Sequence, residues 1–274
     1  MSGTPQSYIM GHTDRERRRL AIQAEVLRPW TERFFAEAGI GPGMRVLDPG
    51  CGVGDVAMLL ARMVGADGYV TGLDFDAGAV ATARQRAAEA ALGQVEFLET
   101  NIADYRAERP FDVVAGRHIL IHTPDPVGVL RTAAGLLRPD GILAFQEYDL
   151  STWAPTWPEF PLNVRIMRLF VEMFPKLTHA DAGSRLHNWY RQVGFPAPRL
   201  VGNVLVDGAE DSLYFEWMAE TLRTALPRAE QMGLAEPGEF DPDRVAAEMR
   251  EYSLAQHTPV GGLIMIGAHA RKPQ

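Results

Sequence analysis

The stretch 46-VLDPGCGVGD-55 decides the fold class of this chain. A short strand pattern, 44–47, ends at Asp48, and glycines then occupy positions 50, 52 and 54 before a helical pattern begins. Glycine has no Cβ, so its backbone adopts unusual φ angles and can approach a ligand closely. The stretch therefore predicts a strand, a ligand-binding turn and a helix.

The residues around this turn repeat a helix followed by a strand, which is typical of a doubly wound parallel sheet. Crossovers in such sheets are right-handed, so the carboxyl ends of the strands line one edge and ligand-binding loops belong there. A helix is expected first, at 14–38. The expected strands are 45–48, 69–74, 95–100, 111–116 and 141–146, and the expected helices are 56–64, 77–92 and 127–137.

The alternation fails after residue 149, where an aromatic and proline-rich segment precedes a helix expected at 164–174. A helix at 182–193 and a strand at 199–206 then continue the pattern. A second helical insertion, 211–252, precedes a last strand at 262–270. We expect one domain with two insertions.

Composition excludes several classes of protein. The 274 residues are 46% hydrophobic, which is ample for a continuous core, and the net charge of -8 argues against a nucleic-acid partner. The single cysteine cannot form an internal disulfide, and no apolar run approaches the ~20 residues of a membrane span. We therefore expect a cytoplasmic protein that binds neither nucleic acid nor membrane, with its oligomeric state open between monomer and homodimer.

The charges near the turn indicate what it binds. A dinucleotide fingerprint, counted from Gly50, would place a glycine where Asp55 stands, and a carboxylate there would repel a diphosphate. This disfavours a nicotinamide oxidoreductase. Asp48, at the end of the strand, suits a cationic group such as an ammonium. Asp74 ends the next strand, where Rossmann-type folds accept hydrogen bonds from ribose hydroxyls.

Together these residues resemble the class I S-adenosylmethionine-dependent methyltransferase family, in particular its small-molecule branch of the ubiquinone-biosynthesis type. The resemblance covers 42–150 well and the remainder in outline. It implies a Rossmann-like, mostly parallel sheet with helical insertions covering the active site, S-adenosyl-L-methionine as cofactor and S-adenosyl-L-homocysteine as product. The implied single domain, 1–274, has an N-terminal helical cover at 1–40, a cofactor-binding core at 41–150, substrate-covering insertions at 151–180 and 208–256, and the rest of the core sheet at 181–207 and 257–274.

The resemblance also assigns cofactor contacts. Asp48 and the glycines would line the methionine part, Asp74 would hold the ribose, and Phe75 would pack on adenine. Asn101 would bond the adenine amine, although Asn is also common as a loop-capping residue. An N-terminal segment around Tyr8 would close over the cofactor. The full predicted set is Tyr8, His12, Gln23, Asp48, Gly50, Cys51, Gly52, Asp74, Phe75, Asn101, Ile102 and Arg117; for Cys51 a small packed side chain is the alternative, and for Arg117 a surface ion pair.

Two histidines follow the fourth expected strand, at the position that faces the reacting groups in this family. His122 occupies the place of a general base in phosphoethanolamine-type methyltransferases, with Tyr8 as its partner, and His118 is a second catalytic candidate. A structural hydrogen-bonding role is the alternative for both. Asp125 is the only obvious third metal ligand nearby, so we expect no metal.

The acceptor site is expected from the end of the fifth strand and from the first insertion. Glu147 and Tyr148 would orient the acceptor, or would form an ordinary strand-end polar cluster. Aromatic side chains would supply an apolar wall, although each could equally be core; the candidates are Trp153, Phe170 and Phe174. This favours O-, N- or C-methylation of a hydrophobic or aromatic metabolite. The alternative is a protein that binds the same cofactor without methyl transfer and catalyses a cyclisation or rearrangement.

Overall fold

The computed structural model describes the backbone of residues 14–274, and the side chains of residues 14, 16 and 17 lie outside this description. The strands are β1 (Arg45–Pro49), β2 (Tyr69–Asp74), β3 (Val95–Glu99), β4 (Phe111–Arg117), β5 (Leu137–Asp149), β6 (Arg199–Asp207) and β7 (Val260–Arg271). The helices are α1 (Asp14–Glu37), α2 (Asp55–Val64), α3 (Ala77–Glu89), α4 (Pro126–Leu136), α5 (Pro161–Met173), α6 (Ala182–Gln192), α7 (Tyr214–Gln231) and α8 (Pro242–Gln256), with a 3-10 turn η1 (Phe174–Lys176).

The chain forms two compact units, and three of the boundaries between them fall inside α1, β6 and β7. One unit, the core unit, comprises Arg28–Asp149, Asp181–Asn203 and Met265–Gln274. The other, the insertion unit, comprises, among the described residues, 14–27, Leu150–Ala180 and Val204–Ile264. The division into a single domain with two insertions stays a prediction.

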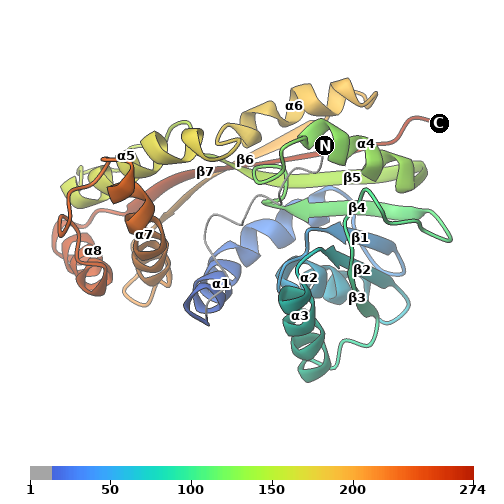
Figure 1. The fold of residues 1–274 in the computed structure, drawn as a ribbon, viewed down its shortest axis with the longest axis horizontal. Helices are drawn as coiled ribbons and strands as arrows, with labels where there is room; N and C mark the ends of the chain where they lie inside the picture. The colour runs from blue at the N-terminus through green and yellow to red at the C-terminus, as the bar shows by residue number, and fades with distance from the viewer. Residues whose placement is uncertain (1–13) are drawn as a thin grey trace. The chain divides into compact units, whose positions relative to one another are not determined.

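The sheet has the order β3-β2-β1-β4-β5-β7-β6, and Figure 1 shows β3 to β5 side by side in the core unit. Strand β1 pairs in parallel with β2 on one side and with β4 on the other. The chain order therefore reverses at β1 and β4, and open α/β sheets bind ligands outside the carboxyl ends of the strands at this switch point. These findings confirm the predicted Rossmann-like fold.

Helices cover both faces of these strands, because parallel strands must be buried on both sides. The helices α2 and α3 contact β1, β2 and β3, whereas α4 and α6 contact β4 and β5 (Figure 1). The end of α1 adds Phe34 and Phe35 to an apolar cluster with α2 and α3. This packing fixes the loops at the carboxyl edge.

The insertion unit contains α5, α7 and α8. The side chain of Asn163 in α5 donates to the carbonyl of Gly261 at 2.9 Å and accepts from its N–H at 3.0 Å. The helical insertion expected at 211–252 contains two helices, α7 and α8. The break has a physical cause, because Gly233 and Gly238 adopt φ of +68° and +80° and Pro237 stands between them.

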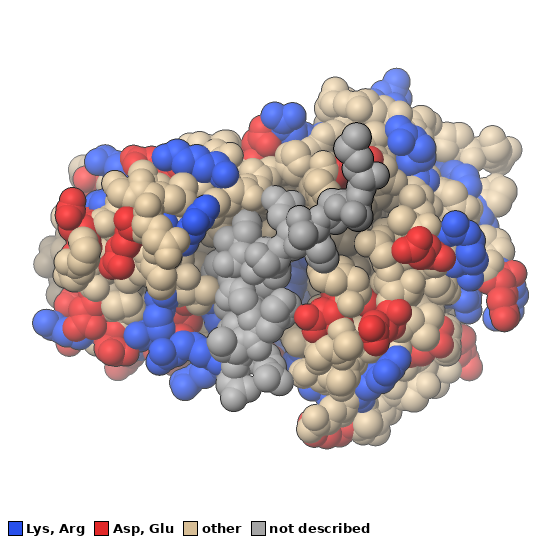
Figure 2. Space-filling model, viewed as in Figure 1, with Lys and Arg blue, Asp and Glu red and all other residues tan. Residues whose placement is uncertain are grey.

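The surface charges and the hydropathy of the helices can be compared with the expectations from composition. On the face shown in Figure 2, acidic and basic side chains are interspersed, so this face presents no extended field of one sign. Across residues 14–274, no helix combines the length and the apolar character that crossing a membrane requires.

Candidate active site

The turn after β1 is held open by three glycines in the left-handed region. Gly50, Gly52 and Gly54 have φ of +67°, +53° and +89°. A Cβ on Gly50 would lie 2.7 Å from Ile119, and one on Gly54 would lie 2.9 Å from Phe97, so packing requires both glycines. A Cβ on Gly52 would meet nothing within 4 Å. The open space, which a ligand could enter, therefore lies at Gly52.

Asp74 connects the end of β2 to this turn. Its Oδ2 accepts a hydrogen bond from the N–H of Gly52 at 2.8 Å, and its Oδ1 accepts one from the N–H of Asp76 at 2.9 Å. Each carboxylate oxygen has a second lone pair, so the half-buried group can accept further hydrogen bonds from hydroxyls. Asp74 thus orders the glycine turn and keeps acceptor capacity for a ligand.

Asp48 and Arg117 end the neighbouring strands β1 and β4. Asp48 is 1% exposed, and its Oδ2 has no hydrogen-bond partner among the described residues. Burial raises the pKa of Asp48 well above its usual range, and the charge of Arg117 opposes this shift. Burial likewise lowers the pKa of Arg117, whose guanidinium forms no ion pair with any described side chain. Two opposite charges therefore stand at one edge of the sheet without pairing with each other.

Thr31 of α1 holds the guanidinium of Arg117. Its hydroxyl accepts from Arg117 Nη1 at 2.9 Å and donates to Gln146 Oε1 at 2.9 Å. Thr31 and Gln146 are both fully buried. The hydroxyl of Thr31 has one proton, which it donates to Gln146, so it can only accept from Arg117. The hydrogen bonds therefore run in one direction, from Arg117 to Thr31 to Gln146.

The predicted adenine contacts lie after β2 and β3. Phe75 is 62% exposed, directly after Asp74, and so offers an aromatic face to a ligand. Ile102 is buried. Asn101 is exposed, and its Oδ1 accepts from the N–H of Ala103 at 2.9 Å, as the loop-capping alternative requires. Its role toward adenine stays a prediction.

The turn after β4 carries both histidines. His118 has a φ of +57° and stacks on Tyr148, with the ring centroids 3.8 Å apart. His122 is exposed, and its N–H donates to the carbonyl of Ile119 at 3.1 Å. Glu147, predicted to orient the acceptor, is 0% exposed and accepts from the backbone N–H groups of this turn. Its geometry agrees with the strand-end polar alternative.

A family model described as a methyltransferase domain matches residues 40–194, which contain the glycine turn and every residue of the site described so far in this section except Thr31. The chain belongs to this methyltransferase-domain family. The predicted resemblance is confirmed at this level.

Relatives of the methyltransferase domain include two named ubiquinone biosynthesis O-methyltransferases. The protein of Xanthomonas campestris pv. campestris (strain B100) is 38% identical over 140 residues, which is 50% of this chain and 55% of the relative. That of Actinobacillus pleuropneumoniae serotype 5b (strain L20) is 34% identical over 144 residues, 50% of this chain and 57% of the relative. The chain spans about half the length of the curated relatives it matches.

Solved structures share the fold of the methyltransferase domain. YcgJ of Bacillus subtilis has a TM-score of 0.60 at 19% identity, covering 89% of this chain and 98% of that one. The [4+2]-cyclase SpnF has a TM-score of 0.55 at 22% identity, covering 89% of this chain and 81% of that one. At these identities the likeness shows the fold alone.

The remaining predicted residues lie elsewhere in the chain. Tyr8 and His12 are outside the described residues. Gln23 belongs to the insertion unit and accepts from Arg19 at 2.8 Å. The wall candidates of the same unit are partly core: Phe170 and Phe174 are buried against each other, and Trp153 is half-buried. Their roles toward cofactor and substrate stay predictions.

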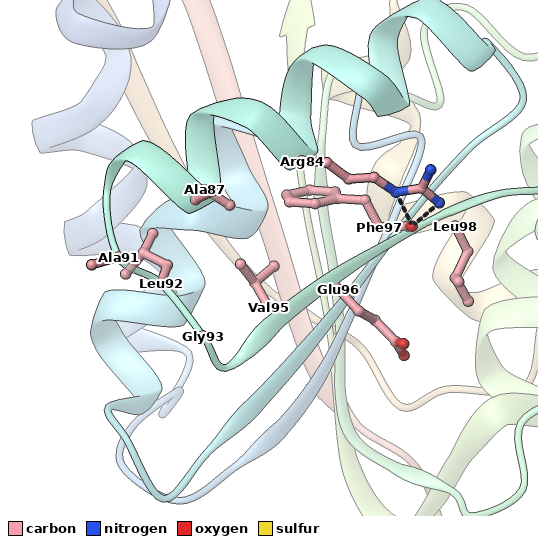
Figure 3. Close-up of a pocket in the computed structure, with 10 residues that line it drawn as sticks. Arg84, Ala87, Ala91, Leu92, Gly93, Val95, Glu96, Phe97 and Leu98 are labelled. Atoms are coloured by element: carbon pink, nitrogen blue, oxygen red, sulfur yellow. Dashed lines mark hydrogen bonds between the residues drawn. The ribbon is translucent and has the colours of Figure 1, made fainter.

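A surface groove of about 520 Å³ lies between α3 and the edge strand β3, away from the predicted residues (Figure 3). Its lining is mostly small and apolar, and Arg84 crosses it to donate two hydrogen bonds to the carbonyl of Phe97. Residues 14–274 hold no cluster of three or more His, Cys, Asp or Glu side chains suited to a metal ion.

Sequence reasoning missed Thr31 and Gln146. Thr31 lies 86 residues from Arg117 and 115 from Gln146, so no local motif signals the contact. The only sequence signal is a threonine within the apolar face of α1.

Proposed function

We propose that the protein is an S-adenosylmethionine-dependent methyltransferase acting on a small molecule. The observation that carries this proposal is the pair of opposite charges at the switch point, the buried Asp48 and the half-buried Arg117, which form no ion pair with each other. A buried charge is costly unless it is compensated, so each implies an opposite charge on the ligand. The amino-acid end of S-adenosylmethionine offers an ammonium for the carboxylate and a carboxylate for the guanidinium.

The neighbouring residues fit the rest of that cofactor. Gly52 leaves open space beside the backbone, Asp74 keeps acceptor capacity for the ribose hydroxyls, and the exposed ring of Phe75 suits stacking on adenine. The bound cofactor supplies a methyl group on a positively charged sulfur. The residues of this chain bind and orient it.

Orientation is the main contribution expected from the chain. Methyl transfer is an in-line displacement, and holding the acceptor atom in line with the methyl carbon can supply much of the rate. Where the acceptor must lose a proton, His122 is the exposed imidazole on the turn after β4 and is our proposed general base. Tyr8 remains its proposed partner.

The proposed acceptor is a hydroxyl group on an aromatic or otherwise hydrophobic metabolite. Support comes from the names of the relatives, which are O-methyltransferases, and from the half-buried Trp153 in the insertion unit. We further propose that the protein acts in the cytoplasm without a nucleic-acid or membrane partner.

Label transfer tests this function. The protein is incubated with methyl-labelled S-adenosylmethionine and a panel of phenols, catechols and hydroxylated polyketides, and extracted products are analysed by mass spectrometry. Labelled product that is absent with Asp48→Asn supports the proposal. A rearranged acceptor without label would instead support the cyclisation alternative, and no cofactor binding at all would refute both.

A further inference from the structure

The turn after β4 is tied to one carboxyl group. Glu147 Oε1 accepts from the N–H of Ile119 at 3.1 Å and from that of Leu120 at 2.8 Å, and Oε2 accepts from the N–H of Ile121 at 3.2 Å. Three consecutive backbone donors thus converge on a side chain that is completely buried in β5. Neither oxygen is left facing solvent where an acceptor could reach it.

The three backbone donors match the anionic form of Glu147, whereas burial opposes it. A carboxylate only accepts hydrogen bonds, so three N–H groups match it, and charge-assisted hydrogen bonds are stronger than neutral ones. Burial raises the pKa of Glu147 to about 8, while the three donors lower it. In α6, burial raises the pKa of the Tyr190 hydroxyl, and the charge of Glu147 adds to this shift. The full acceptor capacity of Glu147 is therefore reached in mildly alkaline solution.

The turn after β4 also supports the predicted active site. Ile119 packs over Gly50 so closely that a Cβ there would lie 2.7 Å from its Cδ1. His118 adopts a φ of +57°, which is unfavourable for a residue with a side chain, and its ring stacks on Tyr148, the neighbour of Glu147. His122 closes the turn through its hydrogen bond to Ile119. Movement of the three donors would therefore shift the glycine turn and the proposed base together.

We propose that Glu147 is a positioning residue: its carboxyl group fixes residues 118–122, so that Ile119 stays packed on Gly50 and His122 keeps its place, without contact with the acceptor. Only the part of the test that measures activity rests on the proposed function. The hydrogen-bond clamp itself can be tested without any substrate.

The test compares Glu147→Gln with Asp112→Asn, at a pH about one unit above the pKa of Glu147. Gln keeps the shape but turns an N–H₂ toward backbone donors, so at least one bond is lost. Asp112 is a matched control on the neighbouring strand β4, since its carboxylate also accepts a backbone N–H, from Arg45 at 2.8 Å, and pairs with Arg138 at 2.6 Å. Amide hydrogen exchange of peptides covering 118–123 is measured by mass spectrometry, and kcat and KM follow from label transfer.

We expect exchange in this turn to be about tenfold faster or more in Glu147→Gln and unchanged in Asp112→Asn, because loss of one such bond opens the turn locally. We also expect kcat to fall about tenfold while the acceptor KM changes less than about threefold, since the alignment and not the binding contact is lost. Glu147→Asp, which keeps the charge one methylene shorter, should give intermediate exchange and restore part of kcat.

Native exchange in Glu147→Gln would overturn the proposal, and so would a loss of kcat of equal size in the Asp112 control. A raised acceptor KM with native exchange would return Glu147 to direct acceptor binding. If Glu147→Gln fails to fold, exchange in Glu147→Asp decides: wild-type protection there contradicts the clamp. If the wild type transfers no methyl group, the exchange result still tests the clamp, so the two failures are distinguishable.

Discussion

Replacing Asp74 with asparagine tests how the end of β2 holds the ligand. The carboxylate accepts from the N–H groups of Gly52 and Asp76 with one oxygen each. An amide has a single oxygen, so one of these donors must face an N–H₂ group, and the charge available to ribose hydroxyls is lost. Hydrogen bonds to a charged group contribute about 1.5 to 3 kcal/mol. At ~1.4 kcal/mol per tenfold, the affinity for S-adenosylhomocysteine should fall about 10- to 150-fold.

Titration calorimetry with S-adenosylhomocysteine measures this change, with Asp76→Asn as the matched control. Asp76 carries the same charge two residues away and caps α3 through the N–H of Ala79 at 2.7 Å. Asparagine caps a helix about as well, so the control should bind within about twofold of the wild type. Wild-type affinity in Asp74→Asn would refute the ribose assignment. Equal losses in both variants would show that only the general negative charge matters.

Four further changes have expected outcomes. Gly52→Val should abolish binding of S-adenosylhomocysteine in calorimetry while the protein stays folded, because φ is +53° and the side chain would fill the open space; retained binding would mean that the turn is misassigned. Thr31→Val should lower the free energy of unfolding by ~1 to 3 kcal/mol, because Arg117 and Gln146 each lose a hydrogen bond to the hydroxyl. It should also weaken cofactor binding, whereas Thr31→Ser should restore both stability and binding. A valine variant that is stable and binds the cofactor tightly would remove Thr31 from the site. His122→Ala should lower turnover about 10²-fold or more with nearly unchanged cofactor affinity, as expected for loss of a general base; normal turnover would leave the histidine a structural role. The folded pKa of Glu147, about 8, lies above its ordinary 4.5, so the folded state holds this proton more tightly and the stability of the wild type relative to Glu147→Gln should fall as the pH rises between these values. Urea unfolding across that range checks this, and a constant or growing difference would mean that the pKa is not raised.

The sequence predicted the alternation of the sheet because each strand of a parallel sheet is apolar and ends at a turn. Strand β2, for example, was expected at 69–74 and lies at Tyr69–Asp74. The helical pattern likewise predicted an insertion at 211–252 but did not divide it, and the structure separates α7 from α8 where Gly233 and Gly238 adopt left-handed φ. A local pattern therefore indicates helical content but does not place a break that depends on left-handed glycines.

The residues of the site likewise divide into those that the sequence predicts and those that it does not. Asp48 and Asp74 could be selected from sequence because a motif places them at strand ends. The true partners of Glu147 could not, since its backbone donors lie 26 to 28 residues away and carry no side-chain signature. A carboxylate that is directed at backbone N–H groups looks, in sequence, the same as one that awaits a substrate.

Asp48 and Arg117 are proposed to hold the two charged groups of a cofactor's amino-acid end. Calorimetric titration of the wild type with S-adenosylhomocysteine and with methylthioadenosine, which keeps adenine, ribose and sulfur but lacks the amino-acid end, tests it most directly. Compensation of these two charges predicts that S-adenosylhomocysteine binds at least about 100-fold more tightly, because each lost charge-assisted contact corresponds to about tenfold or more. Equal affinity for the two compounds, or no binding of either, would contradict the claim.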